Sequence, residues 1–290
     1  MSETLVECVP NFSEGRDAGK VDLLVDAVRS AGAVVLDRTS DADHHRSVVT
    51  FAAAAGVVEE AAFRAVREAV ASIDLRVHTG AHPRIGAADV VPFVPVNGVT
   101  LDDCARLARE TGRRIWEELR VPVYLYEAAA LRPEHRNLAD VRNAGGKLHP
   151  DFGGPALHPS AGAVVVGARK FLIAFNVNLA TSDLTIAKAI ARTVRFSSGG
   201  LPAVKALGVP LESRNLAQVS MNLTDFEQTS VRQAFDAVCA EAARHGVGIV
   251  GSELIGLIPQ RALDPADLPV LRIENFNPSM ILENRIAERS

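Results

Sequence analysis

Apolar residues recur along the first half of the chain with periods that alternate between strand-like and helix-like. Runs of apolar and β-branched residues predict strands at residues 4–9, 33–37, 47–53, 90–96 and 121–126. Amphipathic runs predict helices at residues 17–30, 57–72 and 101–118, and the second of these is rich in Ala and Glu. Gly32 marks the end of the first helix. The first half therefore has the order βαββαβ, extended by one helix and one strand.

The second half repeats this order of elements without repeating its sequence. Strands are predicted at residues 163–166, 170–178, 203–208, 217–223 and 248–254, and helices at residues 182–196 and 230–245. Asn277, followed by a proline, predicts the start of a short terminal helix. We expect an α/β (α+β) fold of two successive βαββαβ ferredoxin-like subdomains, residues 1–162 and 163–290, each with a mixed sheet and helices on one face.

Composition and charge exclude several classes of protein. With 290 residues, 48% of them hydrophobic, the chain can bury a core in each half. A net charge of −4, with Lys and Arg spread along the chain, disfavours a nucleic-acid partner. The sequence shows no apolar run of membrane-spanning length and no leader, so no membrane partner is expected. Cys8, Cys104 and Cys239 do not form a disulfide framework, which favours a cytoplasmic location.

A loop that carries two histidines precedes the predicted strand at residues 90–96. Gly80 and Pro83 argue against a helix here, so His78 and His82 are not expected on one helical face. Loops of this kind carry chemistry more often than they carry core. We therefore expect a pocket wall that presents His82, with Arg84 beside it.

A second loop, residues 37–47, concentrates carboxylates, imidazoles and arginines between two strands. A metal site is one interpretation of this set, and a solvated hairpin connection is another. The ligand spacing matches no known closed metal site. A third interpretation is that a carboxylate of this loop orients His82. Asp37, Asp41 and Asp43 are the candidates, and the sequence leaves the choice among them open.

Glycine and proline interrupt the segment between the two halves, residues 143–162. It can be neither a helix nor a central strand, and glycine lets a backbone approach a ligand closely. From composition alone an inter-domain linker is the plainer interpretation. If the ligand interpretation holds, Gly162→Val is expected to weaken ligand binding while leaving the fold intact. His135, His149 and His158 are expected to be solvent-exposed loop residues.

Long motifs occur in order along nearly the whole chain. They are residues 1–16 (MSETLVECVPNFSEGR), 78–96 (HTGAHPRIGAADVVPFVPV), 121–126 (VPVYLY), 167–179 (GARKFLIAFNVNL) and 215–222 (NLAQVSMN). Together they resemble the formiminotransferase family, and several long, separated motifs are a specific signal. The resemblance implies transfer of a formimino group from N-formimino-L-glutamate to N5 of tetrahydrofolate, which acts as the one-carbon acceptor. It implies no metal.

The chemistry implied by the resemblance needs one proton shuttle. The amine N5 attacks the amidine carbon, and the tetrahedral adduct loses a proton from the incoming nitrogen and gains one on the departing glutamate nitrogen. One imidazole can do both in turn, and His82 is the candidate. Substrate carboxylates require cationic partners, for which the choices near the motifs are Arg46, Arg84, Arg169 and Lys170.

The resemblance also implies where folate binds. The pocket maps onto ten consecutive residues, Gly153, Gly154, Pro155, Ala156, Leu157, His158, Pro159, Ser160, Ala161 and Gly162. Asn176 and Asn178 alternate at the end of an apolar strand and are expected either to face the ligand or to serve as a structural cap. The chain departs from the family pattern in three places: it is shorter just before Asp151, it has Ala161 where a bulky aromatic is frequent, and it has His45 where Asn is frequent.

Other activities stay open at this stage. The donor can be formimino-glutamate, formimino-glycine or formyl-glutamate. A metal-dependent amidohydrolase would use His44, His45, His78 and His82 as ligands, and a binding module without catalysis would keep the glycine-rich segment but not need His82. The resemblance further implies a homodimer. Because the chain ends soon after the second half, a cyclodeaminase that consumes the product is expected to be a separate enzyme.

Overall fold

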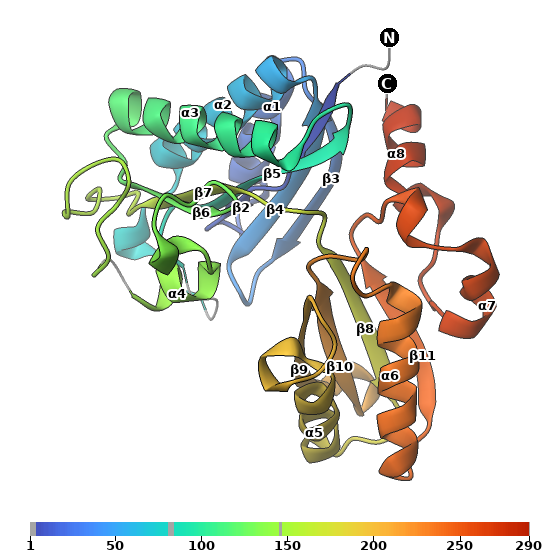
Figure 1. Ribbon diagram of the computed structural model, residues 1–290. Helices are drawn as coiled ribbons and strands as arrows, with labels where there is room; N and C mark the ends of the chain where they lie inside the picture. Colours follow the sequence, from blue (N-terminus) through green and yellow to red (C-terminus); the bar gives the residue numbers. More distant parts are fainter. Residues whose placement is uncertain (1–3, 81–83, 145–146, 290) are drawn as a thin grey trace. The chain divides into compact units, whose positions relative to one another are not determined.

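The structure, a computed structural model, describes residues 4–80, 84–144 and 147–289 (Figure 1). It divides into two units, residues 1–169 with the last two residues of the chain, and residues 170–288. Each unit has one β-sheet whose order of strands and helices is that of a ferredoxin-like fold. The predicted α/β class with two such subdomains is confirmed.

The first unit contains a seven-stranded sheet. Its strands are β1 (Leu5–Cys8), β2 (Asn11–Phe12), β3 (Val34–Asp41), β4 (Arg46–Ala53), β5 (Ala88–Asn97), β6 (Val123–Glu127) and β7 (Val164–Ala168). Its helices are α1 (Ala18–Ser30), α2 (Ala55–Ser72), α3 (Leu101–Leu119) and α4 (Leu138–Asn143), with single 3-10 turns η1 (Leu75–Val77) and η2 (Pro133–His135). β3, β4, the short pair β1 and β2, and β5 follow one another across the sheet as antiparallel neighbours, and β7 and β6 extend it in parallel.

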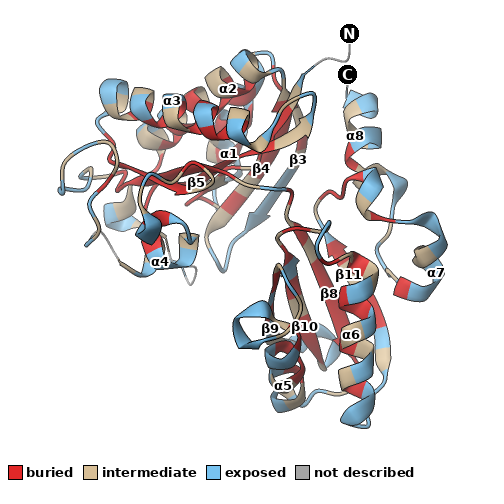
Figure 2. Ribbon diagram, viewed as in Figure 1, coloured by how far each residue is buried: buried red, intermediate tan, exposed pale blue. Residues whose placement is uncertain are grey.

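The first three helices lie on one face of this sheet, and their apolar sides form the core with it (Figures 1 and 2). Phe12, Phe51 and Phe93 from three adjacent strands are completely buried there. The helix starts are specified locally. The side chain of Asp17 accepts from two backbone N–H groups of α1, and Thr100 forms a capping box with Asp103 at the start of α3.

The boundary between the units differs from the expected one at residue 162. The strand predicted at residues 163–166 is β7, which belongs to the first sheet and not to the second. Val165 of β7 pairs with Val90 of β5 on one side and with Tyr124 of β6 on the other. A strand buried between two parallel neighbours has the same continuous apolar sequence in whichever sheet it lies. The sequence pattern alone could therefore not assign this strand to the first or the second sheet.

The second unit is a four-stranded antiparallel sheet in the order β11-β8-β10-β9. Its main elements are β8 (Ile173–Leu179), α5 (Leu184–Val194), β9 (Val204–Leu211), β10 (Leu216–Leu223), α6 (Val231–Arg244) and β11 (Ile249–Ile255). Its C-terminal part contains α7 (Leu268–Leu271) and α8 (Leu282–Arg289), and its 3-10 turns are η3 (Phe196–Ser198), η4 (Glu212–Arg214), η5 (Gln260–Ala262), η6 (Pro265–Asp267) and η7 (Pro278–Met280). Asn277 is a cap as predicted, but it caps the turn η7, and the terminal α-helix begins later.

Side-chain alternation gives the second sheet two different faces. Val177, Phe175 and Met221 are buried on the face that packs against α5 and α6. The other face carries amide, hydroxyl and carboxylate side chains from β8, β10 and β11. The polar face of this sheet therefore presents hydrogen-bonding side chains to a ligand.

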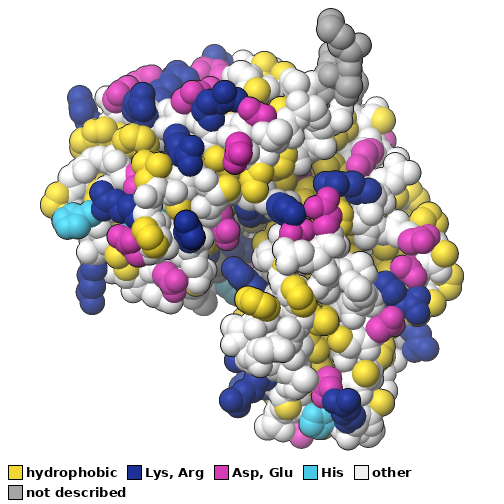
Figure 3. Space-filling model, viewed as in Figure 1, with side chains coloured by type: hydrophobic (Ala, Val, Ile, Leu, Met, Phe, Trp, Pro, Cys, Tyr) yellow, Lys and Arg dark blue, Asp and Glu magenta, His cyan; other side chains and the backbone are white. Residues whose placement is uncertain are grey.

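The described residues include no helix long and apolar enough to cross a membrane. On the face drawn in Figure 3, side chains of Lys and Arg are interspersed with those of Asp and Glu. This surface shows no extended basic field of the kind that binds nucleic acid.

Candidate active site

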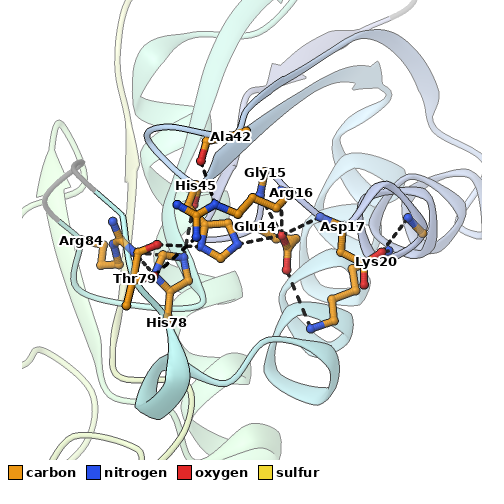
Figure 4. Close-up of polar contacts among 11 residues, drawn as sticks. Glu14, Gly15, Arg16, Asp17, Lys20, Ala42, His45, His78, Thr79 and Arg84 are labelled. Carbon is orange, nitrogen blue, oxygen red and sulfur yellow. Dashed lines mark hydrogen bonds and ion pairs between the residues drawn. The ribbon is translucent and has the colours of Figure 1, made fainter.

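Three segments of the first unit, far apart in the sequence, meet around two histidines (Figure 4). They are the turn before α1, the hairpin between β3 and β4, and the loop after η1. Two glycines allow this approach. A Cβ added at Gly15 would lie 2.3 Å from the carbonyl oxygen of Asp41. A Cβ added at Gly80 would lie 2.7 Å from the carbonyl oxygen of His44, so both positions require glycine for close backbone contact.

Glu14 is the centre of the first segment. Its Oε1 accepts hydrogen bonds of 2.9, 2.9 and 3.0 Å from the backbone N–H groups of Gly15, Arg16 and Asp17. Burial raises the pKa of this carboxyl, but the N–H groups of Asp17 and Arg16 and the hydrogen bond from His45 outweigh burial and hold the pKa below its usual value. Glu14 is therefore an ionised carboxylate with a side chain only 6% exposed.

His45 lies at the hairpin turn, where both of its ring nitrogens face oxygen acceptors. Its Nε2 is 2.9 Å from Oε1 of Glu14, and its Nδ1 is 3.1 Å from the carbonyl oxygen of Thr79. Neither a carboxylate nor a carbonyl can donate a hydrogen bond, so both contacts are satisfied only when both ring nitrogens carry hydrogen. Both ring nitrogens of His45 are thus held by oxygens of the neighbouring segments.

His78 and Arg84 hold the two described ends of the histidine loop. The ring of His78 stacks on that of His45, with centroids 4.0 Å apart and planes 21° apart. The guanidinium of Arg84 contacts the ring of His78 through Nη1 and donates to the carbonyl oxygen of Gly80 at 2.9 Å through Nη2. Both ends of the loop are thus fixed against the hairpin.

The structure describes some of the predicted catalytic residues. His82 lies outside the described residues, so its role stays a prediction. Asp37 is half-buried on β3, and Asp43 is exposed in the hairpin turn. Asp41 accepts 2.8 Å hydrogen bonds from the backbone N–H and from Nδ1 of His44, and the N–H of His44 is the main cause that lowers its pKa.

A buried carboxylate with several arginines around it lies in the same unit. Oδ1 of Asp89 accepts from the backbone N–H of Ile85 at 2.7 Å, and Oδ2 accepts from Arg142. Burial lowers the pKa of Arg46, and the charge of Arg142 lowers it further, while Asp89 acts in the opposite direction on both Arg46 and Arg84. Arg46, Arg84 and Arg142 therefore lie within electrostatic range of Asp89, and Asp41 acts on Arg46 as well.

The end of the glycine-rich segment contacts the histidine loop at its base. His158 and Gly162 exchange backbone hydrogen bonds of 2.8 and 3.0 Å, and Nδ1 of His158 accepts from the N–H of Ala161. The carbonyl oxygens of Ser160 and Ala161 accept from the N–H groups of Leu75 and Ala87. The structure therefore brings part of the predicted folate segment next to the residues that flank the histidine loop.

The glycines of this segment have different roles. Gly162 has φ of +70°, and a Cβ there would lie 2.3 Å from the carbonyl oxygen of Ile85, so the expectation that Gly162→Val leaves the fold intact is wrong. Gly153 has φ of +106° and lies against the ring of Trp116. Gly154 faces open space. The intervening Pro155, Ala156 and Leu157 are exposed, as is Pro159.

Asn176 and Asn178 lie on β8 in the second unit, on the polar face of its sheet. Asn178 is completely buried and Asn176 is 9% exposed. Asn178 donates through Nδ2 to Oε1 of Glu253 at 3.1 Å, and its Oδ1 accepts from Gln218 at 2.8 Å. The prediction did not include Gln218 and Glu253, which lie about 40 and 75 residues further along the chain.

One further expectation about histidines is wrong. His135 is not exposed but completely buried, and its Nδ1 lies 2.8 Å from Oδ2 of Asp151. Oδ2 of Asp151 also accepts from the backbone N–H of Leu125 at 2.8 Å. This pair ties the loop that contains η2 to β6. His149 is exposed as predicted, and His158 is half-buried.

Glu14 and Arg142 belong to the first-unit site but were not predicted from the sequence. A signal for Glu14 exists, because it stands directly before Gly15 in the first motif. Arg142 carries no such signal. Among the described residues, no group of three or more His, Cys, Asp or Glu side chains could hold a metal ion.

Comparison with known proteins gives matches along the whole chain. The model of the formiminotransferase domain, N-terminal subdomain, matches residues 5–169, and the model of the formiminotransferase domain matches residues 174–281. These ranges agree with the two units of the structure.

Two near full-length relatives have the same name. Glutamate formimidoyltransferase of Thermoplasma acidophilum is 45% identical, over 98% of this chain and 97% of that protein. Glutamate formimidoyltransferase of Streptococcus pyogenes is 44% identical, over 97% of this chain and 98% of that protein. Formimidoyltransferase-cyclodeaminase of Sus scrofa is 45% identical over 89% of this chain, which spans only 51% of that longer protein.

Proposed function

The chain belongs to the formiminotransferase family, and on that premise we propose that it transfers the formimino group of N-formimino-L-glutamate to N5 of tetrahydrofolate. The products are 5-formiminotetrahydrofolate and L-glutamate. The observation that carries the proposal is the 44–45% identity, over nearly the full length of both chains, with two relatives named glutamate formimidoyltransferase.

His82 is the proposed general acid and base. It takes the proton that N5 releases after attack on the amidine carbon, and it returns a proton to the departing glutamate nitrogen. The positions of the neighbouring residues support this assignment. Gly80 and Arg84 stand on either side of the segment that contains His82, and Arg84 donates to the carbonyl oxygen of Gly80. A carboxylate of the hairpin, Asp37 or Asp41, is proposed to orient His82.

The two stacked histidines have a different proposed role. His45 and His78 stack close to Arg84 and Arg16, and His45 pairs with Glu14. Both ring nitrogens of His45 already contact protein oxygens, so His45 is not a candidate for the base. We assign it to the positioning of the histidine loop, through its hydrogen bond to Thr79.

Anionic parts of the substrates require the arginines of the first unit. Formimino-glutamate has two carboxylates, and folate has a glutamate tail. Arg46 and Arg84 are the proposed partners, because both lie near Asp89 beside the histidine loop and a guanidinium binds a carboxylate through two parallel N–H donors. The segment from Gly153 to Gly162, with Asn176 and Asn178, is proposed to contact folate. We also propose a homodimer in the cytoplasm.

An assay with each donor in turn tests the proposed function. Purified protein is mixed with tetrahydrofolate and formimino-glutamate, formimino-glycine or formyl-glutamate, and both products are quantified. We expect turnover with formimino-glutamate, at a rate far above that of the other two donors. Transfer from another donor alone would change the assignment of the donor. Release of formamide or ammonia without any folate product, dependent on added metal, would support the amidohydrolase instead.

A further inference from the structure

Polar side chains from three strands form two adjacent rows across the polar face of the second sheet. In the strand register, Asn176 of β8 pairs with Ser220 of β10 on one side and with Glu253 of β11 on the other. The next row contains Asn178 and Gln218. Residues that pair directly, and residues two positions apart on a strand, lie on the same face, so these five side chains form one surface.

A hydrogen-bond network fixes the carboxylate of Glu253 within this surface. Oε1 of Glu253 accepts from Nδ2 of Asn178 at 3.1 Å, and Oε2 accepts from Nε2 of Gln218 at 3.2 Å. Gln218 also donates to Oδ1 of Asn178 at 2.8 Å. Because a carboxylate only accepts, both amides must turn their NH₂ groups toward it, and this sets the direction of every hydrogen bond in the network.

The carboxylate of Glu253 can accept more hydrogen bonds than the two amides donate to it. Each carboxylate oxygen can accept about two hydrogen bonds, and each of these two accepts one from an amide. The side chain of Glu253 is 24% exposed, whereas Asn178 behind it is completely buried. The network therefore holds a planar pair of acceptors at the surface of the sheet, ready for a ligand with two adjacent N–H donors.

We infer that Glu253 binds the 2-amino-4-oxopyrimidine edge of the tetrahydrofolate ring, through the ring N3–H and the 2-amino group. This inference rests on the proposed function, since it names the residue that orients the acceptor. Asn176 and Ser220 lie in the same row and offer both donors and acceptors, which matches a ring edge whose two adjacent N–H donors are flanked by the acceptors O4 and N1.

The amidine of the donor presents a similar pair of N–H groups, but it fits this surface less well. A protonated amidine is a cation with donors only, so it would leave the donor groups of Asn176 and Ser220 unused. Arg214 lies 3.9 Å from Oε1 of Glu253 and also pairs with Glu274, so the carboxylate of Glu253 already has a cationic neighbour. A neutral pyrimidine edge requires no further counter-charge from this surface.

Glu253→Gln tests the inference, with Glu241→Gln as the matched control. Glu241 is in the same unit on α6, which packs against the opposite face of the sheet, and its partner is Arg244. Binding of folinate, which keeps the same pyrimidine edge, is measured by titration calorimetry, and KM for the donor is measured separately. We expect Glu253→Gln to weaken folinate binding about 10- to 100-fold, with the donor KM unchanged and Glu241→Gln equal to wild type.

An analogue of tetrahydrofolate that lacks the 2-amino group gives a second test on the unmodified protein. Wild type should bind this analogue at least about 10-fold more weakly than folinate. Glu253→Gln should bind the analogue little more weakly than wild type does, because the variant and the analogue each remove the same contact. Equal binding of the analogue and of folinate by wild type would overturn the inference, even if the variant did not fold. So would a rise in the donor KM with folinate binding unchanged, or an equal weakening of both. A wild-type protein that neither binds folinate nor transfers the formimino group would instead overturn the proposed function.

Discussion

Glu14 holds His45 across 31 residues of sequence, with its Oε1 2.9 Å from Nε2 of the ring and 6% and 13% of the two side chains exposed. The same carboxylate oxygen accepts three backbone N–H groups from the turn before α1. A single side chain thus joins the turn to the hairpin between β3 and β4. Loss of the charge of Glu14 should therefore destabilise both the turn and the hairpin.

Glu14→Gln should lower stability at neutral pH by about 1 to 3 kcal/mol, the range for hydrogen bonds to a charged group. The pKa of Glu14 is lowered in the folded protein, so its contribution is present above the ordinary carboxyl pKa and is lost as pH falls through the lowered value. The difference in thermal midpoint between wild type and variant, measured from pH 3 to 8, should shrink below about pH 4.5. Glu134→Gln, on an exposed turn, should show no such trend. A constant difference at all pH values would contradict the assigned ionisation.

Periodicity predicted most of the fold because it depends on near neighbours in the sequence. The helix expected at residues 101–118 is observed at Leu101–Leu119, and the strand expected at residues 217–223 is observed at Leu216–Leu223. The short strand β2 and the helix α4 were not predicted, because two and six residues are too few to give a clear period.

The site was less predictable, since it depends on contacts between distant residues. Arg142 reaches Asp89 across 53 residues, and Glu253 reaches Asn178 across 75. His135 was expected to be exposed because loops usually are, but Asp151 draws its ring into the interior. No local pattern encodes such pairs. The motifs that carry the family resemblance contain Asp89 and Asn178 but not their partners Arg142 and Glu253.

Gly162→Ala should destabilise the protein by about 2 kcal/mol or more, whereas Gly154→Ala should be tolerated. Gly162 has positive φ and no room for a Cβ next to the carbonyl oxygen of Ile85, but Gly154 faces open space. Urea unfolding of the two variants checks the difference. If both variants unfold at the wild-type midpoint, then the contact between Gly162 and Ile85 does not constrain the fold.

Arg142→Met should cost about 3 kcal/mol, because it leaves the carboxylate of Asp89, which is 2% exposed, without its hydrogen-bonding cation. The double variant Asp89→Asn with Arg142→Met removes the buried charge as well and should recover part of this loss. Unfolding free energies of both single variants and of the double variant give the coupling energy. Additive effects would show that the pair does not act as a unit.

Glu7→Gln should stabilise the protein at high pH and leave it unchanged at low pH. Burial raises the pKa of Glu7 to about 7, although the charge of Arg169 opposes this. A carboxyl with a raised pKa favours the folded state below the ordinary value of about 4.5, and that stability is lost as pH rises to about 7. Above pH 7.5 the variant should therefore be more stable than wild type by about 1 to 3 kcal/mol, measured by urea unfolding. A variant that is less stable than wild type at pH 8 would show that the ionised carboxylate is stabilised by its partners.

His82→Ala should reduce kcat by roughly two to four orders of magnitude, the usual span for a general acid–base residue. The ring is proposed to move a proton between two nitrogens and not to hold a carboxylate, so KM for both substrates and the affinity for folinate should change little. The exposed His149 provides the control, and His149→Ala should behave as wild type. Wild-type kcat should also fall as the pH is lowered, because the unprotonated imidazole of His82 must accept the first proton. The residual activity of His82→Ala should not show this loss. A variant that keeps most of its activity, or that loses folinate binding in proportion to activity, would show that His82 serves binding and not proton transfer.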